Sequence, residues 1–161
     1  MGRIVTKDEM IELRKLARKE GKLVVFTNGV FDLVHLGHVK YLKGAKSLGD
    51  YLYIGLNSDA SVKKIKGEKR PIQPQEDRAE IVASFYFVDF VCLFDEETPQ
   101  QLISQLTPDI LVKGSDYTVE EIVGADHVIK SGGRVETIQI IEGRSTREII
   151  RQIVKLYGPS D

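Results

Sequence analysis

The stretch that decides the fold lies between residues 23 and 38 and reads LVVFTNGVFDLVHLGH. Its first residues form a short apolar run, which is typical of a strand covered on both faces. Gly29 then allows the backbone to approach a ligand closely, and a helix is expected from His38 onward. The stretch therefore predicts a buried strand, a turn and a helix start in immediate succession.

Four further runs rich in branched residues follow, at 51–56, 90–93, 110–113 and 135–138. The last of them alternates between apolar and polar residues, which suits an edge strand. The helical segments expected between the strands are 38–48, 59–65, 74–86, 99–106 and 119–130. Regular alternation of strand and helix predicts right-handed crossovers and a parallel sheet. We expect an α/β fold: one Rossmann-like domain over residues 1–161, with a doubly wound parallel five-stranded sheet and helices on both faces.

Helix starts carry a common signature, a hydroxyl residue followed three positions later by Glu or Gln. Each such pair fits a capping box, in which two side chains satisfy free backbone amides. The pairs are Thr6 with Glu9, Thr98 with Gln101, Thr118 with Glu121, and Ser145 with Glu148. Pro99 suits the first position of its helix, and Gly21 suits the end of the first helix. A last helix is expected over 146–157, with isoleucines on an apolar side.

Composition and charge are those of an ordinary globular protein. The chain has 161 residues, of which 42% are hydrophobic and 29% charged, and its formal net charge is −1. This balance gives no overall field that would attract nucleic acid or an anionic membrane, so neither is an expected partner. One cysteine, Cys92, excludes an intrachain disulfide. No signal or membrane segment is apparent, and the cytoplasm is the expected location.

Two histidines mark the candidate site, because His35 and His38 bracket Gly37 where the first long strand gives way to a helix. Ligands of parallel sheets bind at the carboxyl ends of the strands, and helix starts bind anions. Two imidazoles there could stabilise the charge that develops during phosphoryl or nucleotidyl transfer. A zinc site is the weaker alternative, because His127 is distant and no second cysteine exists. The P-loop and dinucleotide-binding glycine patterns are both absent from the sequence.

Several segments together resemble the cytidylyltransferase-like nucleotidyltransferases. The chain is most similar to the adenylyltransferase domain of the bacterial ADP-heptose synthase family, over about residues 20 to 155. The matching segments are NGVFD at 28–32, HLGH at 35–38, LNSDASV at 56–62, RPI at 70–72, DRAE at 77–80, LVKGSDY at 111–117 and EGRST at 142–146. The resemblance implies transfer of AMP from ATP to D-glycero-D-manno-heptose 1-phosphate, which gives ADP-heptose, a lipopolysaccharide core precursor, and pyrophosphate. It also implies a homodimer that acts on small-molecule substrates.

Roles for individual residues follow from the resemblance. Three residues are expected to be catalytic: His35, His38 and Lys66. The expected nucleotide-binding residues are Thr27, Asn28, Gly29, Phe31, Gly37, Lys113, Gly114, Asp116, Ser145 and Thr146. The expected substrate-binding residues are Asp32, Asn57, Asp59 and Arg78. For Asp32, capping the turn is an equal alternative, and for Arg78 the alternative is a solvated helix arginine. No protein metal site is expected, because Mg²⁺ should bind mainly through the ATP phosphates.

Two features need separate interpretation. The basic stretch at 63–70, which contains Lys66, is interpreted as a mobile loop that closes over phosphates, although charge runs are often plain solvated faces. Arg147 stands where relatives often carry a third hydroxyl residue, and an arginine there could itself bind phosphate. Family members often carry a sugar kinase domain ahead of this module, so this chain is expected to supply only the adenylyl-transfer step.

Other functions remain open at this point. Within the superfamily the alternatives are a glycerol-3-phosphate cytidylyltransferase and an FMN adenylyltransferase, because the histidine motif distinguishes adenine from cytosine poorly. A non-catalytic nucleotide-binding module is a further alternative, which the presence of both histidines disfavours.

Overall fold

A wholly parallel six-stranded sheet forms the centre of the protein. The computed structural model describes residues 1–141 and 143–158. The strands are β1 (Arg3–Ile4), β2 (Val24–Gly29), β3 (Tyr51–Asn57), β4 (Phe90–Phe94), β5 (Ile110–Gly114) and β6 (Arg134–Ile138). They lie in the order β1-β4-β3-β2-β5-β6, and every pair of neighbours is parallel. The chain builds outward from β2 on one side and then crosses over to add β5 and β6, so a topological switch point lies beside β2.

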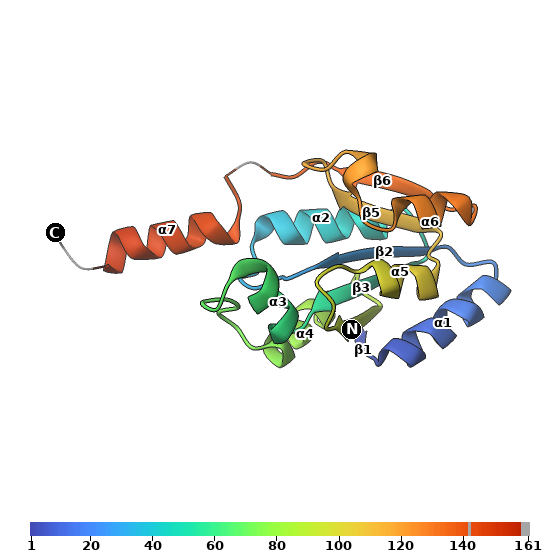
Figure 1. Cartoon of the computed structure of the whole chain (residues 1–161), viewed down its shortest axis with the longest axis horizontal. Coiled ribbons are helices and arrows are strands. Elements are labelled where there is room, and N and C mark those ends of the chain that lie inside the picture. Colours follow the sequence, from blue (N-terminus) through green and yellow to red (C-terminus); the bar gives the residue numbers. More distant parts are fainter. Residues whose placement is uncertain (142, 159–161) are drawn as a thin grey trace.

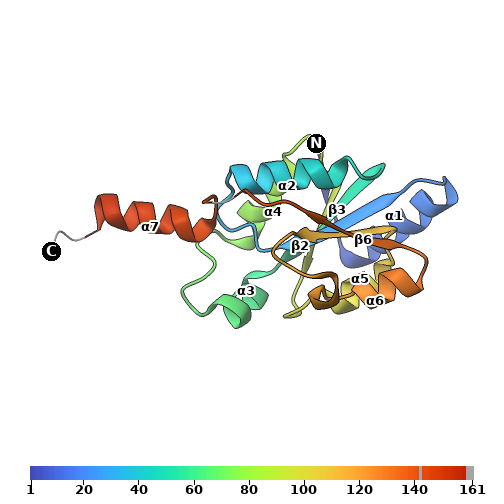
Figure 2. The ribbon, with the colours of Figure 1, turned by 90° about the horizontal axis from the view of Figure 1, so that it is seen from above.

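The helices cover both faces of this sheet (Figures 1 and 2). They are α1 (Lys7–Lys19), α2 (Leu36–Lys46), α3 (Asp59–Lys66), α4 (Gln75–Ala83), α5 (Gln100–Leu106), the 3-10 helix η1 (Val119–Glu121), α6 (Ala125–Lys130) and α7 (Thr146–Tyr157). Buried residues of α1, α5 and α6 form one core cluster, and those of α2 and α4 form the other. Along β2, Phe26 belongs to the first cluster and Val25 to the second, as the period of a strand requires. The doubly wound α/β fold is confirmed.

The expected number of strands is wrong by one. The additional strand, β1, contains only two residues and pairs with the edge of β4 through Arg3 and Ile4. Both residues are exposed, so this strand has no apolar run that would reveal it in the sequence. The alternating strand, β6, does lie at the opposite edge of the sheet, as expected.

Helix boundaries differ from expectation at several places, and the helix expected over 74–86 ends at Ala83. The helix expected at 119–130 is divided into η1 and α6, because Gly124 adopts a left-handed conformation with φ 87°. Pro99 precedes its helix as the capping residue, and Thr98 provides no cap. The helix α2 begins at Leu36, so His38 lies within its first turn.

Complete capping boxes are confirmed at Thr6 with Glu9 and at Thr118 with Glu121, whereas at α7 only the serine half is formed. The Thr6 hydroxyl accepts from the Glu9 amide, and the Glu9 carboxylate accepts from the Thr6 amide at 2.7 Å. At α7 the Ser145 hydroxyl accepts from the Glu148 amide at 3.1 Å. The start of α7 is therefore fixed by its own sequence.

One carboxylate joins the amino ends of the neighbouring strands β2 and β5. Asp109 precedes β5 and accepts from the Val24 amide of β2 at 2.8 Å and from the Arg14 guanidinium of α1 at 2.7 Å. The Arg14 Nε also donates to the Thr107 carbonyl at 3.0 Å. The side chain of Arg14 is 4% exposed and that of Asp109 is 28% exposed, and Arg14 Nη1 finds no hydrogen-bond partner among the described residues. The other contacts offset part of the cost of burying the charge.

The last helix departs from this packing. Figures 1 and 2 show α7 projecting away from the sheet and its covering helices. None of its side chains is buried, and Ile153, Val154, Leu156 and Tyr157 are exposed. Across the described ranges, no helix combines the length and apolar character that crossing a membrane requires.

Candidate active site

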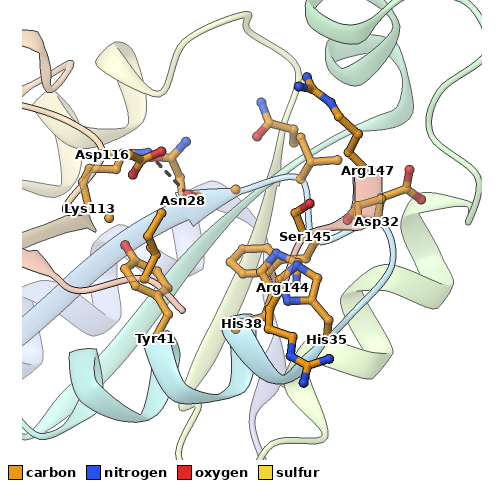
Figure 3. Close-up of a pocket in the computed structure, with 18 of the residues that line it drawn as sticks. Asn28, Asp32, His35, His38, Tyr41, Lys113, Asp116, Arg144, Ser145 and Arg147 are labelled. Carbon is orange, nitrogen blue, oxygen red and sulfur yellow. Dashed lines mark hydrogen bonds between the residues drawn. The ribbon is translucent and has the colours of Figure 1, made fainter. Parts of the chain in front are cut away.

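A cavity of about 660 Å³ opens at the carboxyl ends of β2, β3 and β5. Its walls come from four segments: the turn between β2 and α2, the end of α3 with the loop after it, the end of β5 with the loop after it, and the start of α7 with Ile140, Ile141 and Arg144 before it. Figure 3 shows the side chains that line it. Its position beside the switch point is where open α/β sheets bind ligands.

The turn after β2 requires a glycine and an unusual backbone. Phe31 has a left-handed backbone with φ 48°, and its ring lies over Gly29. A side chain at position 29 would come within 2.9 Å of that ring, which explains why glycine occupies it. The Phe31 ring also lies 5.1 Å from the ring of His38. The turn thus supports one catalytic candidate directly.

The two histidine rings face one another in the cavity wall. The rings of His35 and His38 stack with centroids 3.8 Å apart and an interplanar angle of 24°. Gly37 permits this, because a Cβ there would come within 2.9 Å of the His35 ring. Their Nδ1 atoms are buried and find no hydrogen-bond partner among the described residues. The pair therefore has hydrogen-bonding capacity that the protein itself leaves unused.

Burial keeps both imidazoles neutral. It lowers the pKa of His35, and together with the neighbouring His35 it lowers the pKa of His38 to about 4. Two neutral rings can stack closely without repulsion, whereas two imidazolium ions could not. A polyphosphate in the cavity would favour the charged form and raise these pKa values. No side chain of the described residues caps the start of α2 beside them, so its amides remain available to an anion.

The loop after β5 forms one end of the cavity. Lys113 Nζ lies 3.4 Å from the Asn28 carbonyl and 6.0 Å from the centre of the Tyr117 ring. Burial lowers the pKa of Lys113 to about 8, although Asp116 opposes this effect. A side chain at Gly114 would collide with the Asp116 carboxylate at 2.5 Å, so glycine allows that carboxylate to fold over the strand end.

The start of α7 contributes hydroxyl and guanidinium groups. Ser145, Thr146 and two flanking arginines, Arg144 and Arg147, line the cavity. The Thr146 hydroxyl donates to the Leu33 carbonyl at 3.3 Å, a direct contact between this segment and the histidine turn. An anion at this helix start would meet backbone amides as well as positive side chains.

The fourth wall, the loop after α3, is bound by a buried carboxylate of the histidine turn. Asp32, 1% exposed, accepts from Arg70 Nε at 2.7 Å, from the Ile72 amide at 2.9 Å and from the Gln73 amide at 3.0 Å. Burial alone would raise the pKa of Asp32, but the amide and guanidinium hydrogen bonds outweigh it and lower the pKa below its usual range. Asp32 therefore holds the loop after α3 against the histidine turn.

Positive charge dominates the cavity lining. Five lining residues are cationic and two are carboxylates, one of which, Asp32, is paired with Arg70. The cations are Lys66, Arg70, Lys113, Arg144 and Arg147. A concave site with this balance and low-dielectric walls concentrates polyanions such as nucleoside triphosphates.

The structure places most of the expected residues on this cavity. Those on its lining are Asn28, Gly29, Phe31, Asp32, His35, Gly37, His38, Asn57, Lys66, Lys113, Gly114, Asp116, Ser145 and Thr146. Glu142, part of one matching segment, lies outside the described residues. Thr27, Asp59 and Arg78 do not lie on this lining, and their surroundings are described below.

Thr27 lies beneath the cavity instead of in it. Its side chain is fully buried, and its hydroxyl pairs with the Tyr41 hydroxyl at 2.7 Å. Tyr41 in turn donates to the Val112 carbonyl at 3.0 Å and reaches the lining itself. Because strand residues alternate in direction, Thr27 points into the packed layer under α2.

Arg78 is buried, so the alternative of a solvated helix arginine is wrong. It is 0% exposed, and its guanidinium donates to the carbonyls of Val30, Asn57 and Gln73 at 2.6, 2.9 and 3.1 Å. It also donates to the Asp59 carboxylate at 2.8 Å. These partners belong to the segments that carry the cavity residues, so Arg78 and Asp59 hold the site together from below.

Sequence reasoning missed several lining residues. Arg70 lies in the basic stretch at 63–70. Of the cations in that stretch, only Lys66 and Arg70 reach the lining. Arg144 flanks the Ser-Thr pair, a signal that could have indicated it. Tyr117 ends the matching segment at 111–117 but was given no role, and Tyr41 lies outside the matching segments. Side-chain direction, which spacing alone does not give, separates these residues from their neighbours.

The comparisons with known proteins agree with this geometry. A model of the cytidylyltransferase-like family matches residues 26–152. The bifunctional protein HldE of Syntrophotalea carbinolica is 51% identical over 155 residues, which cover 96% of this chain and 32% of that protein. HldE of Campylobacter jejuni subsp. doylei is 56% identical over 151 residues, which cover 94% and 31% of the two chains. The chain thus spans about a third of the length of the curated relatives it matches.

Solved structures show the same fold. A lipopolysaccharide core biosynthesis protein from Thermoplasma volcanium is 31% identical with a TM-score of 0.61, and the match covers 75% of this chain and 98% of that one. A pantoate-beta-alanine ligase from Francisella tularensis has a TM-score of 0.63, with coverage of 100% and 81%. At 15% identity, that second similarity concerns the fold alone.

Proposed function

Because the chain belongs to the cytidylyltransferase-like family, we propose that it is a nucleotidyltransferase that transfers AMP from ATP to D-glycero-D-manno-heptose 1-phosphate. The products are ADP-heptose and pyrophosphate. The observation that carries the proposal is the cationic cavity with His35 and His38 stacked in its wall. The heptose acceptor rests on the resemblance of the motifs to the ADP-heptose synthase family and on the identity to the HldE proteins.

The reaction requires positioning and charge stabilisation more than proton transfer. A phosphate oxygen of the acceptor attacks the α-phosphorus of ATP, and the bond to the bridging oxygen of the β-phosphate breaks as pyrophosphate leaves. That attacking oxygen is ionised at neutral pH, so no general base is needed. The protein must hold both substrates in line and stabilise the added negative charge on the phosphorus.

Each wall of the cavity has a part in this scheme. The histidine rings and the uncapped start of α2 donate to the α- and β-phosphates. The start of α7, with Ser145, Thr146 and Arg147, holds the β- and γ-phosphates. Lys113 and Asp116, at the end of β5, contact the nucleoside. This division keeps the pyrophosphate and the nucleoside on separate walls.

Magnesium is expected to arrive with ATP and, when bound, neutralises charge on the phosphate oxygens. Within residues 1–141 and 143–158, no three His, Cys, Asp or Glu side chains gather in a metal cluster. We therefore propose that phosphate oxygens and water hold the ion.

An acceptor screen tests the proposal. The protein is incubated with ATP or CTP, Mg²⁺ and one acceptor, and pyrophosphate release is measured. The acceptors are both anomers of heptose 1-phosphate, both anomers of mannose 1-phosphate, glycerol 3-phosphate and FMN. We expect release with ATP and one heptose 1-phosphate anomer. Release only with CTP and glycerol 3-phosphate, or only with FMN, would assign another family reaction, and triphosphate binding without release would indicate a non-catalytic module.

A further inference from the structure

We propose that Arg70 is a further substrate-binding residue, which holds the phosphate group of the acceptor, and that Asp32 is the positioning residue that orients it. The inference rests on the proposed function, because it concerns the second substrate of the same cavity. It gives a role to an ion pair that joins two walls of the site, Arg70 Nε to Asp32 Oδ2 at 2.7 Å.

The ion pair with Asp32 uses only the Nε–H donor of the Arg70 side chain. An arginine side chain has five N–H donors in a planar fork. Within the part of the chain that the structure describes, the Arg70 side chain donates only through Nε, and Arg70 lines the cavity. The two terminal nitrogens therefore remain for a ligand. Their spacing matches two oxygens of a phosphate, which arginine binds in a bidentate manner.

Asp32 can anchor the loop after α3 without its contact to Arg70. The carboxylate already accepts from the amides of Ile72 and Gln73, which anchor the loop by themselves. Arg70 adds a contact through the side of its guanidinium, which fixes the plane and direction of the fork. Asp32 is 1% exposed, so it has no freedom to reach a substrate itself.

The place of Lys66 and Arg70 in the cavity indicates which ligand they bind. Lys113 and Asp116 stand at one end of the cavity and Asp32 at the other (Figure 3). The starts of α2 and α7 already offer amides, hydroxyls and two arginines to the triphosphate. Lys66 and Arg70 come from a different segment, the end of α3 and its following loop. A phosphate monoester carries nearly two negative charges at pH 7, and these two cations suit it.

Asp32 also links the position of the bound acceptor to that of the histidine pair. Asp32 lies three residues before His35 in the same turn, so one carboxylate sets the spacing between the acceptor cation and the histidine pair. In-line displacement depends on that spacing, since misplacement of about 1 Å can cost 100-fold in rate. Asp32 thus affects the rate through Arg70, without touching substrate.

The experiment compares Arg70→Gln, Arg70→Lys and Asp32→Asn with Lys69→Gln. Lys69 is the exposed neighbour of Arg70 and does not line the cavity, so its loss makes the same charge change elsewhere. Steady-state rates are measured while ATP and heptose 1-phosphate are varied separately, and ATP binding is measured alone by calorimetry. Thermal unfolding confirms that each variant is folded.

We expect Arg70→Gln to raise the acceptor KM about 10- to 100-fold, as loss of a charge-assisted contact does, with the ATP Kd within twofold. Arg70→Lys should recover part of this loss, and Lys69→Gln should match the unchanged protein. Asp32→Asn should lower kcat and raise the acceptor KM, but should add little when Arg70 is already Gln. A rise in ATP Kd with an unchanged acceptor KM, or no change in either, would overturn the inference.

A second arm separates this inference from the proposed function. If no acceptor supports turnover, the proposed function fails, and binding of mannose 1-phosphate is then measured with a non-hydrolysable ATP analogue present. Binding that is lost in Arg70→Gln and kept in Lys69→Gln supports the phosphate site. Equal binding by both variants, or no binding by the unchanged protein, contradicts it.

Discussion

The histidine wall and the α7 wall of the cavity are built in different ways. The histidine turn leaves the central strand of the sheet, is packed under Phe31, and is held from below by Arg78, whose guanidinium binds the Val30 carbonyl. The α7 segment reaches the same cavity from a helix that buries none of its side chains. Its described hydrogen bond to the histidine turn is that of Thr146 with Leu33.

From this difference we expect that the two walls can be changed largely independently. Groups on the histidine wall have fixed positions, which suits the stabilisation of a transition state. Groups at the start of α7 are supported locally by a capped helix, which suits binding of phosphates that differ in position from substrate to product. Changes below the histidine wall should therefore affect folding and rate, whereas changes in α7 should affect ATP binding or little at all.

The largest effect is expected at the base of the histidine wall. Arg78→Ala should lower the free energy of unfolding by about 3–5 kcal/mol, because it leaves Asp59 and three carbonyls without their partner. Urea unfolding followed by circular dichroism measures this. Arg151→Ala provides the control, because Arg151 forms only an exposed pair with Glu148 on α7. A loss below 1 kcal/mol for Arg78→Ala would show that the two walls are equally independent of the core.

The next effect concerns catalysis by the histidine wall. His38→Ala should lower kcat about 100- to 1000-fold, the usual result of removing one transition-state donor. Pyrophosphate release at saturating substrates measures it. His127→Ala is the matched control, because His127 pairs with Thr107 and lies away from the cavity. Full turnover by His38→Ala would show that His38 does not stabilise the transition state.

The same histidine should make stability depend on pH. His38 has a folded pKa of about 4, below the ordinary value of 6.5, so the unfolded chain binds more protons between these values. Stability must then fall as the pH drops from 6.5 to 4, by on the order of 3 kcal/mol at most. Asp32, whose pKa is lowered from 3.8, contributes only below this window. Urea unfolding at pH 7, 6 and 5 should show a shallower decline for His38→Gln, and an unchanged slope would contradict the assignment.

A smaller effect is expected at the start of α7. Arg147→Ala should raise the KM for ATP about tenfold, as loss of one charge-assisted hydrogen bond does, and change kcat less than His38→Ala does. Steady-state kinetics with ATP varied would measure both parameters, again with Arg151→Ala as control. A fall in kcat as large as that of His38→Ala would place α7 in the same functional class as the histidine wall.

The smallest effect is expected at the far end of α7. Leu156→Ser should change the free energy of unfolding by no more than about 0.5 kcal/mol, because Leu156 is 71% exposed. The buried counterpart Leu56→Ala should cost about 2–5 kcal/mol. A larger loss for Leu156→Ser that depends on protein concentration would show that α7 packs against a second copy. The homodimer expected from the resemblance stays a prediction until that is measured.

The sequence predicted the central part of the fold well because its signals are local. The apolar runs of β2 to β5 and the alternation of β6 follow directly from which faces are buried. The two-residue strand β1 has no such signal, since a short exposed edge strand depends on its neighbour β4. Gly124 divided a helix that looked continuous, because its left-handed backbone is a tertiary feature.

The candidate site was predicted where residues leave strands and enter helices. The position of His35 and His38 follows from that rule, as does that of Lys113. The burial of Arg78 was not predicted, because nothing in its helix indicates that this arginine faces inward. There its guanidinium donates to carbonyls of three segments. Whether a polar side chain binds substrate or holds the loops depends on contacts distant in sequence, which spacing does not encode.

The hydrogen bonds of Asp109 affect the cavity as well as the stability of the sheet, because they fix β5 against β2. Asp109 and Val24 stand four residues before Lys113 and Asn28, so these hydrogen bonds lie about 13 Å from the cavity at 3.3 Å per strand residue. A slip of β5 against β2 would first have to break the contacts of that carboxylate, and it would carry Lys113 away from the Asn28 carbonyl. The position of Lys113 in the cavity is thereby fixed at the opposite end of the strands.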